Sequence, residues 1–585
     1  MTAAETIDQR TATRADAAPC SVMSTTVRAR VVVIGICAVV LIAPFEALRP
    51  LIAWPGQSLT IVECVLAAVL AASGVAIVAS QPAPALLLRG LLPWGSVAGV
   101  ALISALCAPL YRANAVHMSL RLGVLAVLCA LVPIAKPAAG RDMTRILRTI
   151  VMSGALVAAL VLLDFARVPI VESFFQQFRS GVAVVGAQIR ASGPLQYPTI
   201  ASMYLEVVFA VGVGLLLDDE PLGMRLVLLA VLSLVAEAIV LTFTRAGLIT
   251  MGLTLAGVAV VRQSAGTPGR TLAWIALLTL IVGSELLVSR SAESWRLRLT
   301  SEGQGRWFSA AIDAPRSIAA DTMRPIAVPL VITNTGRATW DSSSNEPVRL
   351  SYHWVASDSD EVVAWEGRRT NFPEPVPPGA TVSLDATVSG PGRPGRFRLM
   401  WDMEQEKRLW FSTEPDATPV FTDVLVTGAA ATLPHRTSGP ARIPIAQERP
   451  GRLMLWRAAW RMALAHPLLG VGPDNYRLLY GEYGAFKRAD PRVHSNNMYL
   501  EVLAGSGILG LTTFLWAGLH TVRESIAAAR TSAAGAGVAA AVTAVAVHGL
   551  VDSFLSFTST YLLIAVIAGL AASMGHGANA HAHRV

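Results

Sequence analysis

Apolar residues gather in long runs, separated by charged residues or by clusters of proline and glycine. A helix needs about 20 mostly apolar residues to cross a hydrocarbon core of about 30 Å, and the runs approach that length. The pattern therefore predicts a polytopic α-helical membrane protein with about 12 transmembrane helices. The runs lie at about 31–48, 58–79, 91–110, 118–135, 147–165, 199–217, 224–243, 246–261, 271–289, 498–520, 533–552 and 556–574.

A long polar segment divides these runs into a first group of nine and a last group of three. We therefore expect a membrane domain at 28–289, a polar region outside the membrane at 290–497, and a second membrane part at 498–574. The ends, 1–27 and 575–585, are expected to be tails, the first of them disordered. No small-residue cleavage site follows the first apolar run, so we expect a retained helix rather than a signal peptide.

Basic residues indicate the orientation of the chain. With the N-terminus in the cytoplasm, the cytoplasmic short loops hold more arginine and lysine than the opposite loops. Both tails are then cytoplasmic, and 290–497 faces the periplasm or the cell exterior. The net charge of +8 is spread over short loops and forms no single basic patch, so we expect no nucleic-acid partner.

Composition supports the membrane interpretation. The chain has 585 residues, of which 53% are hydrophobic and 15% charged, and its mean hydropathy is +0.53. It is too apolar for an ordinary soluble protein and too long for one domain. Four of the five cysteines lie in apolar runs and none forms a CxxC motif, so we expect no zinc site, disulfide framework or cofactor. The cysteines are Cys20, Cys37, Cys64, Cys107 and Cys129.

Within the polar region, 318–428 alternates apolar and polar residues over short stretches that turn motifs separate. Several short strands at this spacing predict an all-β sandwich. The strands are expected at 326–332, 348–354, 381–388 and 396–401, and the turns at 334–336, 377–379 and 392–395.

A helix is predicted at 450–466, where apolar and aromatic residues recur every three or four positions. Arginines are distributed among them, and a helix of this kind can lie on a membrane surface. The alternative is a packing helix of the polar region. The apolar positions are Leu453, Trp456, Trp460 and Leu464, and the arginines are Arg452, Arg457 and Arg461.

Three stretches at the predicted outer face carry candidate chemistry. Arg190 precedes the sixth run, and Arg245 stands between the seventh and eighth runs, where almost no loop separates them. An arginine so close to the membrane is costly unless it binds an anion. The alternative is an arginine at a helix end whose long side chain reaches the membrane surface and places its charge in water. The third stretch, with His494, Asn496 and Asn497, enters the tenth run.

Four motifs, in this order and topology, resemble the O-antigen ligase and O-antigen polymerase superfamily, and His548-Gly-Leu-Val-Asp552 resembles the C-terminal pattern of that family. Together they cover most of the chain outside 318–428. They are Arg190-Ala-Ser-Gly193 with Pro198, Thr244-Arg-Ala-Gly247, Pro467-Leu-Leu-Gly-Val-Gly-Pro473 with Asn475, and His494-Ser-Asn-Asn497 with Leu500, Glu501, Gly505, Gly507 and Gly510.

The resemblance implies an inverting, metal-independent glycosyltransferase of the bacterial inner membrane. Such an enzyme transfers a glycan from an undecaprenyl-diphosphate carrier to a saccharide acceptor, either lipid A-core or a growing glycan, on the periplasmic face. Arg190 and Arg245 would bind the carrier diphosphate, because guanidinium groups stay charged and bind phosphate oxygens in pairs. His494 would act on the acceptor hydroxyl as a base or as an orienting group.

Asn497, one turn from His494, is expected to bind a sugar hydroxyl or the diphosphate, and Arg457 and Asn475 complete the predicted substrate-binding residues. A helix N-terminus near His494 disfavours imidazolium, so we expect a neutral ring. The family often has a second histidine where this chain has Asn496. That departure leaves the role of His494 open between proton transfer, acceptor orientation and simple capping.

Other polar or glycine positions near His494 have structural interpretations. We expect Tyr499 and Glu501 to be structural, and the glycines at 505–510 to allow close helix packing. The tail residues His576, His581 and His583 could bind metal, but a disordered tail is the simpler interpretation.

The β-region also resembles immunoglobulin-like modules of the kind found in an autophagy receptor, through the stretches 331–336, 377–379 and 395–401. Its tryptophans, Trp340, Trp354, Trp401 and Trp410, are expected in the core, with sugar stacking as the alternative.

Two other classes of protein stay open. A transporter of lipid-linked sugars would need charged residues near the membrane midplane and an internal repeat, and neither is clear in the sequence. A non-catalytic membrane protein that displays the β-module would leave the arginines and His494 unexplained. Within the enzyme class, the β-insert favours a polymerase or an atypical ligase over a minimal ligase.

Overall fold

The structure of the whole chain is a computed structural model. The predicted tail up to residue 17 lies outside the described residues, as do His583 and the side chains of Cys20 and His581. The structure describes residues 18–582 except 55–56, 81–83, 135–140, 180, 187, 265–267, 289–293, 296–297, 300–306, 345, 360, 407–408, 415–416, 430–449 and 487–488.

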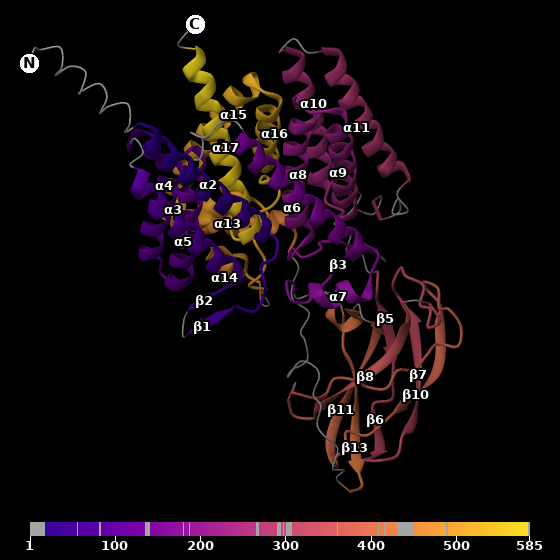
Figure 1. Cartoon of the computed structure of the whole chain (residues 1–585). Helices are drawn as coiled ribbons and strands as arrows, with labels where there is room; N and C mark the ends of the chain where they lie inside the picture. The colour runs from indigo at the N-terminus through magenta and orange to yellow at the C-terminus, as the bar shows by residue number, and fades with distance from the viewer. Residues whose placement is uncertain are drawn as a thin grey trace, which may run out of the picture.

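Each predicted apolar run overlaps a helix, with ends that differ by several residues in places (Figure 1). Within the described residues, eight of these helices are long and apolar enough to cross a membrane, and four others are apolar over shorter lengths. The chain is therefore a multi-pass membrane protein, while the count of twelve spans stays a prediction. The helices are α2 (Ala18–Ile42), α3 (Ile61–Ser80), α4 (Pro84–Cys107), α5 (Arg112–Ile134), α6 (Arg141–Phe165), α8 (Pro198–Leu216), α9 (Leu222–Leu241), α10 (Arg245–Ser264), α11 (Pro268–Val288), α15 (Met498–Thr531), α16 (Ala533–His548) and α17 (Thr558–Ala582).

Two helices form the centre of the bundle. In α8, 94% of the residues in the apolar stretch are buried inside the protein, and in α17 89% of them are buried. The other six long helices bury between 33% and 61%, so their outer faces are available to lipid. α16 packs against α8, α10, α15 and α17, and it thereby joins the two groups of helices that the polar region separates in sequence.

The β-region, predicted at 318–428, begins at β5 with residue 310 and lies beyond one end of the helix bundle (Figure 1). Its strands form two sheets, of orders β10-β7-β5 and β6-β13-β11-β8-β9, which share one hydrophobic core. All four predicted strands are present; the immunoglobulin-like assignment stays a prediction. The strands are β5 (Ala310–Asp313), β6 (Ser317–Asp321), β7 (Ile326–Asn334), β8 (Val348–Ala356), β9 (Val362–Ala364), β10 (Thr381–Val388), β11 (Gly395–Gln405), β12 (Leu409–Trp410) and β13 (Val420–Thr427).

The tryptophans of the β-region are mainly core residues. Trp340, Trp354 and Trp401 are buried in the shared core, as expected. Trp410 is only partly buried, and the guanidinium of Arg369 lies over its ring at 4.8 Å. The ring of Trp410 is thus already covered by a side chain of the protein itself.

Shorter elements lie at the end of the bundle from which the β-region extends (Figure 1). The hairpin of β3 (Ala183–Val185) and β4 (Gln188–Arg190) and the helix α7 (Pro169–Phe175) precede α8, and β1 (Ile52–Trp54) pairs with β2 (Gln57–Leu59). An ion pair between Arg167, after α6, and Glu346 joins this level to the β-region.

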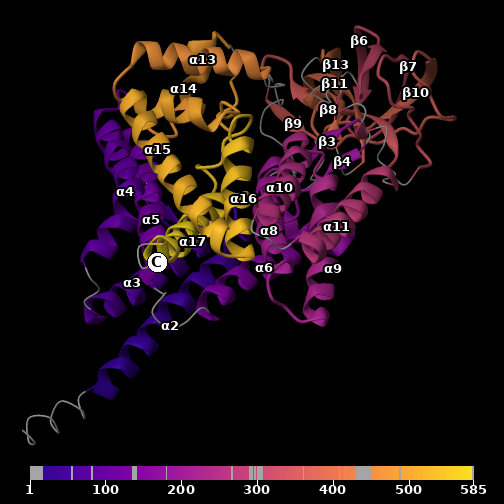
Figure 2. The ribbon, with the colours of Figure 1, turned by 90° about the horizontal axis from the view of Figure 1, so that it is seen from above.

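The predicted helix at 450–466 is α13 (Arg452–Ala465), and α14 (Tyr476–Gly484) follows it. Both lie beside the start of α15, against which they bury a small core (Figure 2). The buried face of α13 contains Leu455 and Met462, whereas Trp460 and Leu464, from the predicted apolar stripe, are exposed. The helix therefore packs by one face and leaves an apolar face uncovered within the described residues.

Candidate active site

The histidine motif forms a turn that ends at the start of α15. Asn497 is the N-cap: its side-chain oxygen accepts a hydrogen bond from the backbone N–H of Leu500, at 2.9 Å. Its amide Nδ2 donates to the carbonyl oxygen of Leu550, also at 2.9 Å. Asn496 adopts a φ of 53°, a left-handed conformation that asparagine tolerates. The side chain of Asn497 thus fixes the turn, and its predicted contact with substrate stays a prediction.

His494 is paired with Glu501, one turn inside α15. The ring nitrogen Nδ1 of His494 lies 2.6 Å from Oε1 of Glu501. The other carboxylate oxygen accepts hydrogen bonds from the backbone N–H and the hydroxyl of Ser495, at 2.8 and 2.7 Å. Because Glu501 is held at both oxygens, it fixes the orientation and the tautomer of the ring, leaving Nε2 for chemistry.

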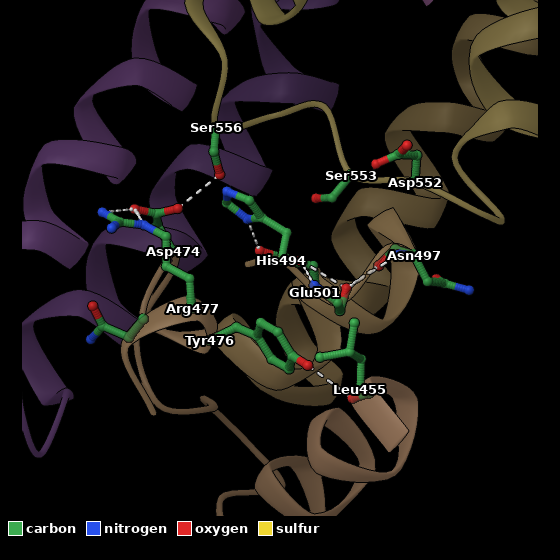
Figure 3. A network of polar contacts seen from close by, with 12 residues as sticks. Leu455, Asp474, Tyr476, Arg477, His494, Asn497, Glu501, Asp552, Ser553 and Ser556 are labelled. Carbon is green, nitrogen blue, oxygen red and sulfur yellow. Dashed lines mark hydrogen bonds and ion pairs between the residues drawn. The ribbon is translucent and has the colours of Figure 1, made fainter. Parts of the chain in front are cut away.

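A second carboxylate, Asp474, lies on the other side of the imidazole (Figure 3). It accepts hydrogen bonds from Arg477, at 2.9 Å, and from the hydroxyl of Ser556, at 2.8 Å. Asn114 of α5 donates to it at 3.2 Å. The imidazole therefore lies between two carboxylates that come from the 467–475 turn and from α15.

These carboxylates set the protonation of His494. Burial is the largest influence and alone would lower its pKa, but the charge and hydrogen bond of Glu501 and the charge of Asp474 raise the pKa above its usual value. The expectation of a ring kept neutral by the helix end is therefore corrected. A full carboxylate charge at hydrogen-bond distance outweighs the partial positive charge of about half a unit at a helix N-terminus. For Asp474, Arg477 outweighs burial and lowers the pKa.

The same three side chains are the candidate metal ligands among the described residues. Asp474, His494 and Glu501 offer ligand atoms that all lie within 4.8 Å of one another. However, the short contact between Nδ1 and Oε1 requires a proton between these atoms, and Asp474 is already paired with Arg477. The donor set thus fits a hydrogen-bonded acid–histidine–acid cluster better than a cation site.

Glycines let the 467–475 turn approach α15 closely. The helix opens at Gly507, which has a φ of 65°, and the backbone N–H of Gly472 donates to the carbonyl oxygen of Gly505, at 2.8 Å. A Cβ atom at Gly507 would lie 2.3 Å from the backbone of Leu468. The glycines therefore serve close packing, as predicted, but the packing partner is this turn, which carries Asp474, rather than another helix.

The first predicted arginine lies on the turn that carries the second. Arg190 Nε donates to the carbonyl oxygen of Thr242 at 3.0 Å, and its terminal nitrogen donates to the hydroxyl of Thr244 at 3.3 Å. Arg245 follows directly as the first residue of α10. Two stretches that lie more than fifty residues apart in the sequence therefore form one basic site.

An ion pair that the sequence analysis missed holds the Arg190 loop. Asp164, at the end of α6, lies 2.5 and 2.6 Å from the terminal nitrogens of Arg179. Its carboxylate also accepts hydrogen bonds from the backbone N–H groups of Ser192 and Gly193, at 2.9 and 3.0 Å. The position of Asp164 near a helix end was visible in the sequence, but its partner was not.

A third arginine joins the basic site. Arg298 is buried, and its Nε donates to the carbonyl oxygen of Phe243 at 3.2 Å. The sequence signal for it was weak: a basic residue shortly after the ninth apolar run. Arg190 and Arg298 thus both contact the turn between α9 and α10, directly before Arg245.

Two aromatic rings connect the basic site with the histidine. Tyr197 follows the Arg190 loop, and its ring centroid lies 5.8 Å from that of Phe557. The Phe557 centroid in turn lies 5.4 Å from that of His494. The imidazole and the arginine-bearing loop are therefore parts of one site at the same end of the bundle.

The other two predicted substrate-binding residues have different surroundings. Arg457 is exposed on α13. Asn475 is fully buried, and its amide donates to the carbonyl oxygens of Leu110 and Val471, at 3.0 and 2.9 Å, while its side-chain oxygen accepts from Asn114. These bonds position Asp474, its neighbour in the chain.

Asn475→Ala is expected to destabilise the protein by about 1–3 kcal/mol, because it leaves buried carbonyl groups without donors. The melting temperature in detergent measures this loss. A direct substrate role would give the opposite pattern, with weaker substrate binding at an unchanged melting temperature.

The family model described as O-Antigen ligase matches residues 444–515. This segment contains α13, α14 and the first half of α15, and with them Asp474, His494 and Glu501. A comparison with curated proteins found no match. The matched segment is the part of the chain that builds the acid–histidine–acid cluster, and it includes two of the four motifs on which the resemblance rests. The match supports the resemblance to the O-antigen ligase superfamily over this segment.

Proposed function

We propose that this protein transfers a glycan from an undecaprenyl-diphosphate carrier to a hydroxyl group of a saccharide acceptor. The observation that carries the proposal is the pairing of His494 with Glu501 inside the family-matched segment, close to a basic site. An oriented imidazole suits activation of a hydroxyl, and clustered guanidinium groups suit a diphosphate leaving group.

In the proposed reaction, Nε2 of His494 accepts the proton of the acceptor hydroxyl. The acceptor oxygen forms a bond to the anomeric carbon as the bond from that carbon to the diphosphate oxygen breaks. The electron pair leaves with undecaprenyl diphosphate, and a single displacement inverts the anomeric configuration. Glu501 stabilises the imidazolium that forms, as the carboxylate does in a catalytic triad.

Arg190 and Arg245 are proposed to bind the diphosphate, with Arg298 adding positive charge behind the turn. The carrier gains negative charge at the bridging oxygen as it leaves, and fixed guanidinium groups stabilise that charge without reorganisation. No metal ion is part of this mechanism, because the arginines supply the charge that a divalent cation supplies in other diphosphate sites.

The proposed location is the bacterial inner membrane, with this site and the β-region on the periplasmic face and both termini in the cytoplasm. The described start of α2 and end of α17 lie at the end of the bundle away from the β-region, which supports this orientation (Figure 1). The distribution of arginine and lysine between the loops supports it as well.

Glu501→Gln is expected to move the acid limb of the pH–rate profile to lower pH. Transfer requires a neutral ring, so activity falls as the pH drops through the raised pKa of His494. Removal of the Glu501 charge lowers that pKa. The measurement is kcat against pH, with Glu482→Gln, an exposed glutamate of α14, as control. An acid limb at the same pH in both variants would exclude His494 as the titrating base.

One experiment separates the classes of function. Purified protein in nanodiscs receives lipid-linked glycan with either lipid A-core or a second lipid-linked glycan as acceptor. Release of undecaprenyl diphosphate with the first acceptor indicates a ligase, and release with the second a polymerase. Movement of the glycan across the bilayer without release would instead indicate a transporter.

A further inference from the structure

A buried histidine–glutamate pair lies between two helices of the bundle, outside the mechanism described above. Nδ1 of His548, the last residue of α16, lies 3.0 Å from Oε2 of Glu206 in α8, and both side chains are 1% exposed. Ser202 donates a hydrogen bond to the other carboxylate oxygen, at 2.6 Å. Ionisable residues at such depth are costly in a membrane protein and are usually retained for function.

On one side, Glu206 contacts the helix that begins with Arg245. Gly247 of α10 packs directly on it: a Cβ atom there would lie 3.2 Å from the Glu206 carboxylate and 2.4 Å from the Ser202 hydroxyl. A side chain at 247 would therefore push α10 away from α8. Since α8 itself follows the Arg190 loop, Glu206 lies where both arginine-bearing elements meet.

On the other side, the two residues that follow His548 contact the histidine motif and the start of α15. The carbonyl oxygen of Gly549 accepts a hydrogen bond from the backbone N–H of Met498, at 2.8 Å. The next carbonyl, of Leu550, accepts the amide of Asn497. The end of α16 thus holds the first turn of α15, three residues from His494.

We propose that Glu206 and His548 are a positioning pair that fixes the distance between the basic site and His494. The inference rests on the proposed function of both sites. A buried hydrogen-bonded pair has one preferred geometry, whereas apolar side chains of the same volume permit sliding between α8 and α16. The pair contacts no substrate in this proposal and acts through the two elements that it joins.

The test measures the distance directly. Spin labels are placed at Val182→Cys, exposed beside β3, and Glu482→Cys, exposed on α14, in a full-length chain without native cysteines. Double electron–electron resonance spectroscopy in nanodiscs then gives the distribution of distances between the two labels, which lie on the two sides of the site. No substrate is needed, so this result does not depend on the proposed reaction.

The central variant is Glu206→Leu with His548→Phe, since an apolar pair of similar volume usually preserves stability. We expect an unchanged melting temperature, a broadened or shifted distance distribution, and kcat for glycan release lowered by about 10- to 100-fold. Binding of undecaprenyl diphosphate is expected to stay within about threefold, because the arginines remain. Glu206→Gln retains a hydrogen-bond acceptor and is expected to restore the native distance and most of the rate.

Tyr204→Phe is the matched control: it removes a buried hydrogen bond of α8, to Ser153 at 2.9 Å, without touching α16. Its distance distribution and kcat should match those of the native chain. A native distance and native kcat in the double variant would overturn the proposal and leave the pair as packing alone. If His494→Ala also retains full transfer, the proposed function fails, whereas a changed label distance would still support the positioning role.

Discussion

His494→Ala is expected to lower the rate of glycan transfer by about 10²- to 10⁴-fold, the usual contribution of a positioned general base. The turn should survive the change, because Glu501 keeps its hydrogen bonds to Ser495 and Asn497 keeps its cap. The measurement is the release of undecaprenyl diphosphate from a lipid-linked glycan in the presence of acceptor. Undecaprenyl diphosphate should bind the variant normally, since the arginines are unchanged.

His494→Gln separates the two roles that the sequence left open. Glutamine can orient an acceptor hydroxyl but cannot take its proton at neutral pH. Loss of transfer in both variants supports a base, whereas activity in the glutamine variant alone supports an orienting group. His466→Ala serves as control, because His466 ends α13 within the same family-matched segment but lies outside the cluster. Normal release by His494→Ala would remove the residue from the mechanism.

Arg245→Lys is expected to lower kcat/KM for the lipid-linked donor by about 10- to 100-fold, and Arg245→Ala by more. Lysine keeps the charge but loses the fork of donors that binds two phosphate oxygens at once, and each charge-assisted hydrogen bond contributes about 1.5–3 kcal/mol. The effect should fall on the donor, with the KM for acceptor little changed. Steady-state kinetics with each substrate varied in turn make this measurement.

The matched control is Arg262→Lys, in the last turn of the same helix α10 and therefore at the opposite end from the site. Equal donor kinetics in the native chain and in both lysine variants would contradict diphosphate binding at Arg245. An equal loss in both would indicate a general effect on α10 rather than a contact with the carrier.

Asn475 and Asn497 lie beside the acid–histidine–acid cluster, and their contact with substrate stays a prediction. Asn475 and Asn497 were expected to bind substrate, yet both amides are used for turns and caps. Asparagine bonds local backbone as readily as it bonds a ligand, so the sequence cannot separate the two uses. Glu501 was expected to be structural. Its contact with His494 could not be read from helical spacing, because His494 precedes the helix.

The polarity pattern by itself determined the membrane helices, four of the five longest strands of the β-region and the positions of Arg190, Arg245 and His494 along the chain. These features depend on neighbouring residues, through hydropathy and alternation. The tertiary structure alone decided that Arg190 lies on the turn before Arg245, that His494 lies between two carboxylates, and that Glu206 reaches His548 across 342 positions. Such pairings depend on which helices pack together, and that packing is set by the shape of whole faces rather than by any local pattern.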